Sequence, residues 1–234
     1  MPRARSKDPF VAAIKSYLVP AFEPHGFKLN GKGTVMRIRN DLVQWMTVSL
    51  SRWGSKTFRA EFGTNSLFYP RDFLHLDVGG GAILIPAGKR GDKMHGFWSA
   101  TTHERADKHM EEVVKLFCEQ ALPVLEAVTT VEGLSQELES LHHEDLQTGK
   151  DLNHHRYFER GCCAVRLQNY PQAVAMLRRA IELYDFDGRD WCGGFSNSCK
   201  EIISAIERGE AEALQTRWVT ESITRLRLTE VSRN

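Results

Sequence analysis

The spacing of apolar side chains changes along the chain, and each spacing predicts one kind of element. Near the N-terminus apolar residues recur every three or four positions, as on an amphipathic helix: Phe10, Ile14, Tyr17, Leu18 and Ala21. Asp8 suits the N-cap, and Pro9 suits the first helical position, where a missing N–H costs nothing. Pro20 predicts that this helix ends or bends near Val19.

The period then becomes two, which is typical of β-strands. Along residues 34–39, one side of the predicted strand carries Val35, Arg37 and Arg39. Asn40-Asp41 tolerates left-handed backbone angles and predicts a hairpin turn into a second strand, Leu42 to Ser51. A third strand, Phe58 to Thr64, and a segment at 82–85 extend the pattern. These segments predict an antiparallel meander.

Helical spacing returns near Thr101, which forms a capping box with Glu104. Residues 142–153 are polar and predict a domain boundary, and after Asn153 the spacing is helical only. The predicted fold class is therefore α+β, with an antiparallel β-meander and flanking helices followed by an all-helical, repeat-like C-terminal part. The predicted domains are 1–145 and 154–234.

Charge is distributed unevenly, although the net charge of the 234 residues is +1. Residues 1–100 carry 15 Lys/Arg and 7 Asp/Glu, and residues 101–234 carry 16 and 23. One interpretation is that the two oppositely charged halves attract each other or are separately solvated. The other is that the first half presents a basic surface to an anionic partner. Five cysteines, two of them adjacent, favour reduced thiols. With a charged N-terminus and no apolar stretch of membrane-spanning length, we expect a cytoplasmic protein without a membrane partner.

Within residues ~8–145, a set of apolar and turn-like segments forms a recognisable pattern: Leu18 to Phe22, His25-Gly26-Phe27, Met36 to Arg39, Leu42 to Ser51, Phe58 to Thr64, Trp98 and Ala121-Leu122-Pro123. In this pattern the N-terminal part resembles the bacterial family called domain of unknown function 4304. The resemblance implies a fold and a bacterial source, and it assigns no site residues.

Residues 154–184 resemble a single tetratricopeptide-like helical hairpin. The matching positions are Tyr157, Gly161, Tyr170, Ala173, Leu177 and Ala180. Small residues stand where two antiparallel helices touch, as close packing requires. Asp185 stands where the family usually has Pro. One repeat alone favours a hairpin packed on its neighbours over a peptide-binding groove.

Candidate chemistry is sparse. Gly79-Gly80-Gly81 with Lys89-Arg90 lacks the ending of a phosphate-binding P-loop. His142-His143 and His154-His155 are adjacent pairs, whose rings point about 100° apart on a helix, and no metal-binding frame surrounds them. The sequence therefore predicts no catalytic residue, no cofactor and no metal ligand.

Three functions remain open. The first is a non-catalytic module that binds or regulates another protein, with an immunity-type role suggested by fold-level analogy. The second is binding of single-stranded nucleic acid on an exposed sheet face, through Arg37, Arg39, Trp45, Arg52 and Arg59. The third is an enzyme of unknown reaction with a cleft between sheet and helices, where the polar groups are His75, Asp77, Lys89 and His95.

Overall fold

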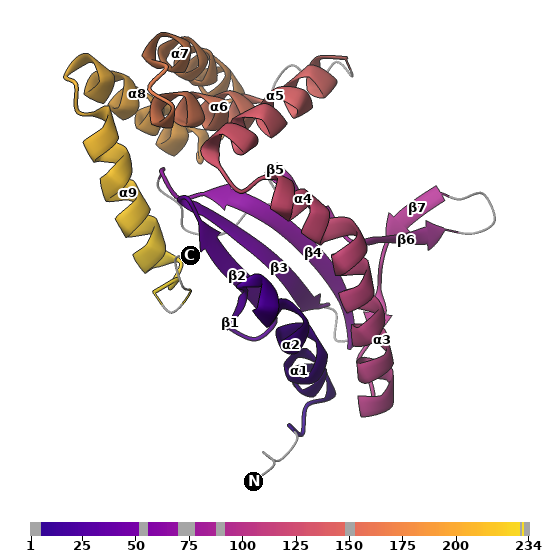
Figure 1. Cartoon of the computed structure of the whole chain (residues 1–234). Helices are drawn as coiled ribbons and strands as arrows, with labels where there is room; N and C mark the ends of the chain where they lie inside the picture. Colours follow the sequence, from indigo (N-terminus) through magenta and orange to yellow (C-terminus); the bar gives the residue numbers. More distant parts are fainter. Residues whose placement is uncertain are drawn as a thin grey trace. The chain divides into compact units, whose positions relative to one another are not determined.

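The chain divides into two compact units in the computed structural model, which describes residues 6–51, 56–69, 78–87, 92–147, 153–229 and 231 (Figure 1). The first unit comprises residues 1–65, 74–127 and 228–234, and the second comprises 66–73 and 128–227. The helix Val131–Gln147 thus falls in the second unit, and the last residues of the chain fall in the first. The sequence had suggested two consecutive domains instead.

The first unit is built on an antiparallel sheet, which confirms the predicted meander. Its strand order is β1-β2-β3-β4-β5, and β8 also pairs with β4. The strands of this sheet are β1 Lys28–Asn30, β2 Thr34–Arg39, β3 Leu42–Leu50, β4 Thr57–Ser66, β5 Val78–Ala82 and β8 Trp98–Ser99. A separate two-stranded sheet is formed by β6 Leu84–Ala87 and β7 Asp92–His95.

The predicted hairpin turn lies between β2 and β3. Asn40 and Asp41 have φ angles of 48° and 62°. Two consecutive left-handed residues match the right-handed twist of the flanking strands, which explains why this short polar pair closes the hairpin.

Two long helices in the first unit each contain a π-helical segment and continue past a proline. The first runs through α1 Pro9–Ala13, a π segment Ile14–Leu18 and α2 Val19–Phe22. The second runs through α3 His103–Leu116, a π segment Phe117–Ala121 and α4 Leu122–Ala127. Each π segment ends two residues before its proline, Pro20 or Pro123. The wider π turn accommodates a residue that has no N–H and a bulky ring. Of the two outcomes predicted near Val19, an end or a bend, the helix therefore does not end there.

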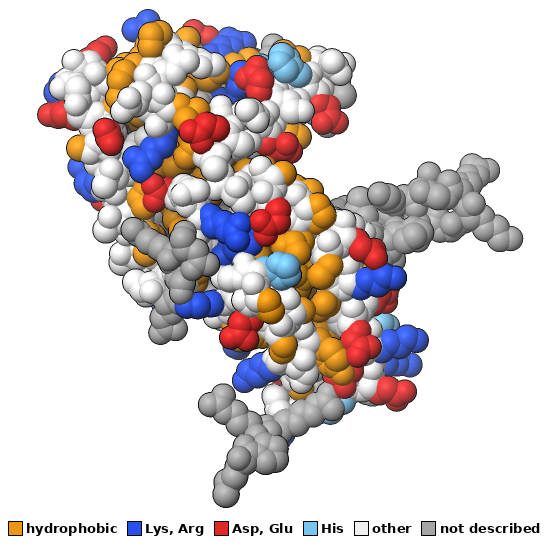
Figure 2. All heavy atoms as spheres, viewed as in Figure 1, with side chains coloured by type: hydrophobic (Ala, Val, Ile, Leu, Met, Phe, Trp, Pro, Cys, Tyr) orange, Lys and Arg blue, Asp and Glu red, His pale blue; other side chains and the backbone are white. Residues whose placement is uncertain are grey.

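These two helices pack on one face of the sheet and form the core of the unit (Figure 1). Phe22 and Phe117 meet edge to face at 6.0 Å, and Phe10 packs against Phe58 of β4 at 5.1 Å. Figure 2 shows apolar side chains along the line where the two helices meet. The second helix begins one residue later than the sequence suggested, because the hydroxyl of Thr102, not Thr101, accepts from the N–H of Arg105.

The second unit is a series of helices, which confirms the predicted helical C-terminal part. They are α5 Val131–Gln147, α6 His154–Arg166, α7 Tyr170–Asp187, α8 Cys192–Glu207 and α9 Ala211–Arg225. The helix α5 continues through His142, which is buried, into the polar stretch expected to be a linker. Asn153 and Asn169 cap α6 and α7 by accepting from the N–H groups of Arg156 and Gln172.

The helices α6 and α7 form the expected antiparallel hairpin. A Cβ atom added to Gly161 of α6 would lie 2.7 Å from Cγ of Leu177 on α7, so only glycine fits this contact without rearrangement. Within the described residues, no helix has the length and apolar character needed to cross a bilayer.

Candidate functional site

The predicted basic and aromatic face divides between the two sides of the sheet. In the register of β2 and β3, Arg37 is paired with Gln44, and Met36 is paired with Trp45. Directly paired residues share a side of an antiparallel sheet, and consecutive residues alternate. Arg37 and Trp45 therefore point to opposite sides and do not form one surface.

Arg37 is fully buried on the side of the sheet that faces α4. Its guanidinium donates to Oε1 of Gln44 at 2.6 Å and to the carbonyl of His25 at 2.8 Å, and it pairs with Glu126 at 2.8 Å. Its Cζ atom lies 4.4 Å from the centre of the Phe27 ring. This arginine joins the sheet to α4 and to the end of the first helix, so its role is structural.

Glu126 is shared between two arginines, because its second oxygen accepts from Arg39 at 3.0 Å. Burial alone would raise the pKa of Glu126, but the hydrogen bonds and charges of Arg37 and Arg39 outweigh burial and lower it. Burial lowers the pKa of Arg37, and Glu126 opposes that effect. The cluster is therefore a stabilising ion pair with one partner out of contact with water.

Trp45 is only 4% exposed and has no free ring face on which a base can stack. Its Nε1 donates to Oδ1 of Asn65 at 2.8 Å, and its ring packs so closely on Gly63 that an added Cβ would lie 2.9 Å away. Arg59 is exposed and pairs with Glu61 at 3.1 Å, while Arg52 lies outside the described residues. The structure thus does not bring the five predicted residues together as a stacking platform.

The predicted cleft residues fall mostly outside the described residues. His75, Asp77 and Lys89 are not described, and His95 is placed only by its backbone, which pairs with Leu84 in the β6–β7 hairpin.

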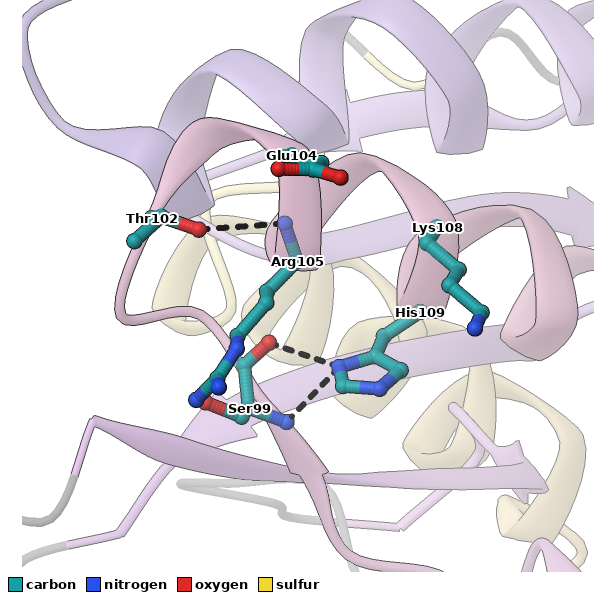
Figure 3. Close-up of a pocket in the computed structure, with 6 residues that line it drawn as sticks. All are labelled: Ser99, Thr102, Glu104, Arg105, Lys108 and His109. Atoms are coloured by element: carbon teal, nitrogen blue, oxygen red, sulfur yellow. Dashed lines mark hydrogen bonds between the residues drawn. The ribbon is translucent and has the colours of Figure 1, made fainter.

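A pocket of about 610 Å³ lies instead at the start of α3 (Figure 3). Nδ1 of His109 lies 3.1 Å from the backbone nitrogen and 2.8 Å from the carbonyl oxygen of Ser99, so the imidazole is held by the β8 backbone. The Ser99 hydroxyl is 3.1 Å from that of Thr101. These contacts do not form a serine–histidine nucleophile pair. The pocket is lined by Ser99, Thr102, Glu104, Arg105, Lys108 and His109.

The second unit holds a denser group of functional side chains, here called the α6–α8 cluster. Nε2 of His154 lies 2.9 Å from Oδ2 of Asp187, so the N-terminus of α6 contacts the C-terminus of α7. Arg189 holds the same carboxylate with two contacts of 2.5 Å. The cluster is defined as His154, Tyr184, Asp187, Arg189, Trp191 and Cys192.

Aromatic rings enclose one side of this cluster. The His154 ring stacks on Tyr184 at 4.6 Å and meets Trp191 edge to face at 5.3 Å. Arg189 lies over Trp191, with its Cζ atom 4.7 Å from the ring centre. Cys192 is buried at the first position of α8.

The surroundings shift the pKa values of the three reactive groups. The Arg189 hydrogen bonds lower the pKa of Asp187 to about 2, assisted by His154. Burial lowers the pKa of His154, although Asp187 opposes this. Burial raises the pKa of the Cys192 thiol, and the neighbouring Asp187 charge adds to that effect. The cluster therefore holds an ionised carboxylate beside a neutral imidazole and a protonated thiol near neutral pH.

No family model, no curated protein and no solved structure matches this chain. The resemblances to the domain of unknown function 4304 family and to a tetratricopeptide-like hairpin therefore stay predictions.

The α6–α8 cluster was missed because its members lie far apart in the sequence. His154 appeared only as one of an adjacent pair, Asp187 is the last residue of α7, and Cys192 is the first residue of α8. The predicted helical hairpin nevertheless contained a sign of the contact between His154 and the end of α7. An antiparallel pair of helices that turns near Gln168 brings His154 level with the far end of α7, within about one helical turn of Tyr184.

Proposed function

We propose that this protein is a non-catalytic module that binds another protein, and that the partner docks at the corner between α7 and α8. The observation that carries the proposal is the exposure of two aromatic side chains five residues apart, one at the end of α7 and one just before α8. Phe186 is 80% exposed and Trp191 is 45% exposed. Exposed aromatic and arginine side chains are the residue types that contribute most binding energy at protein interfaces.

The cost of leaving Phe186 in water gives the size of the expected interaction. Complete burial of a phenylalanine contributes about 1.5–3 kcal/mol, so covering the exposed 80% contributes about 1.2–2.4 kcal/mol. Trp191 already packs against Arg189, and its remaining surface extends the same corner.

Charge around the corner favours a basic partner segment. The end of α7 and the turn after it carry three carboxylates, Asp185, Asp187 and Asp190. The turn also carries Arg189, which is already paired with Asp187. An incoming segment with an apolar side chain flanked by Lys or Arg therefore complements the surface in shape and in charge.

The experiment uses the full chain as bait in lysate of its source cells, followed by affinity measurement with the purified captured partner. Phe186→Ala is expected to weaken binding about 7- to 50-fold, which corresponds to the energy given above. Leu146→Ala is the matched control, because Leu146 is also an exposed apolar residue of a helix in this unit, at 44% exposure. Equal affinity of the Phe186→Ala variant and the wild type contradicts the proposed surface.

We also propose a cytoplasmic location and a bacterial source. All five cysteines are free, which supports a reducing compartment. An immunity-type role is one form that a non-catalytic partner-binding function takes, and the identity of the captured partner tests it.

A further inference from the structure

The α6–α8 cluster brings together three side chains of the types that coordinate transition metals. His154, Asp187 and Cys192 each offer one ligand atom, and these three atoms lie within 4.8 Å of one another. The residues come from the start of α6, the end of α7 and the start of α8. We propose that these three side chains form a zinc site. This proposal does not rest on the proposed protein-binding function, although the cluster shares Asp187, Arg189 and Trp191 with the proposed docking corner.

The donor set selects the metal. One imidazole nitrogen, one thiolate sulfur and one carboxylate oxygen suit Zn²⁺ better than Ca²⁺ or Mg²⁺, which prefer oxygen donors alone. Three protein ligands leave one tetrahedral position for water. Cys192 is at the first position of α8, where the positive end of the helix dipole favours a thiolate.

The geometry needs only side-chain adjustments. Ligand atoms around tetrahedral zinc are about 3.3–3.6 Å apart, given Zn–N and Zn–O distances near 2.0–2.1 Å and Zn–S near 2.3 Å. The 2.9 Å contact between His154 and Asp187 must open slightly, and the other two ligand-atom distances must close by about 1.3 Å at most. Rotations about the χ angles of these side chains cover such changes.

Binding of zinc requires one ligand to lose a proton and another to move one. The Cys192 thiol releases its proton to solvent as the Zn–S bond forms. Nδ1 of His154 accepts from the backbone N–H of His155 at 3.0 Å, so the ring proton is on Nε2 and faces Asp187. Coordination through Nε2 moves this proton to Nδ1 and ends the hydrogen bond from His155, which is a cost that metal binding must exceed.

Arg189 would orient the Asp187 ligand when the metal is bound. It contacts both oxygens of Asp187, and His154 shares Oδ2. When the metal takes Oδ2, Arg189 keeps Oδ1 and orients the carboxylate from outside the coordination shell, as outer hydrogen bonds do in known zinc sites. Tyr184 and Trp191 pack against the imidazole and limit the access of water to this side of the site.

The test is a titration of the metal-free, full-length protein with Zn²⁺ in competition with a chromogenic chelator of micromolar affinity. Separately, Co²⁺ replaces Zn²⁺ to give an absorption spectrum. The wild type is expected to bind about one equivalent, and Cys192→Ser and Asp187→Asn are expected to reduce affinity at least about tenfold. A sulfur-to-cobalt charge-transfer band is expected in the wild type and absent in Cys192→Ser. Cys118→Ser and His143→Gln, which change an exposed thiol and an exposed imidazole elsewhere, are expected to bind like the wild type.

The proposal is overturned if the wild type does not compete with the chelator for zinc, or if a control variant loses the binding while Cys192→Ser retains it. If Cys192→Ser does not fold, Asp187→Asn decides the question, because this carboxylate lies on the surface side of the cluster. Circular dichroism of each metal-free variant separates loss of a ligand from loss of the fold.

Discussion

Gly161 lies where α6 and α7 touch, and replacing it with alanine tests the packing of the hairpin. The new methyl group would lie 2.7 Å from Cγ and 2.8 Å from Cδ2 of Leu177, which is fully buried. Overpacking of this kind costs about 1–3 kcal/mol, while the better helix propensity of alanine returns about 0.8–1 kcal/mol. Gly161→Ala is therefore expected to lower the free energy of unfolding by about 0–2 kcal/mol.

Gly194→Ala is the matched control, because Gly194 is also helical but has no atom within 4 Å of an added Cβ. It is expected to raise stability by up to about 1 kcal/mol. Urea denaturation followed by circular dichroism at a helical wavelength gives both values. A Gly161→Ala variant as stable as Gly194→Ala would refute the close contact. A second change, Leu177→Val, is expected to recover part of the loss in Gly161→Ala, because it shortens the side chain that the methyl group meets.

Two further predictions concern the first unit. The Arg37 and Arg39 contacts lower the pKa of Glu126 below its usual 4.5, so its contribution to stability is complete above that pH and is lost as pH falls through the lowered pKa. Glu126→Gln is expected to be less stable at pH 7 by about 1–3 kcal/mol and to approach the wild type once the pH falls below the lowered pKa of Glu126, and urea midpoints measured from pH 7 downward test this. Equal midpoints at pH 7 would show that the ion pair adds nothing. Asp8 accepts from the N–H groups of Phe10 and Val11, so Asp8→Ala is expected to cost about 1 kcal/mol in the same assay, and an unchanged midpoint counts against the cap.

Local patterns predicted most of the elements, because their causes are local. The alternation of apolar and polar residues predicted the strands on both sides of the Asn40-Asp41 turn. The left-handed φ angles of these two residues explain why the turn forms there. At Pro20 the sequence predicted either an end or a bend of the helix, and the structure shows that the helix continues through a π segment that precedes the proline. That π segment depends on the packing of the whole helix on the sheet, and the sequence around Pro20 does not show it.

The candidate site was much less predictable than the fold. The alternation of side chains along the strand placed Arg37 on one side of it, but this pattern does not show which side a helix covers. The burial of Arg37 also depends on its ion pair with Glu126, which is 89 positions later in the sequence. Likewise, the contact of His154 with Asp187 depends on how two helices align along their length. Binding chemistry between distant residues follows from tertiary geometry, so composition and spacing predicted no metal ligand here.

The division of the chain also constrains how it folds during synthesis. Tyr69 lies early in the chain but belongs to the second unit, where its hydroxyl donates to Glu159 and its carbonyl accepts from Ser222. Leu228 and Val231 are buried and belong to the first unit. Synthesis must therefore reach Val231 before the first unit has all of its described buried side chains, and a chain break between residues 74 and 227 separates each fragment from part of its own core.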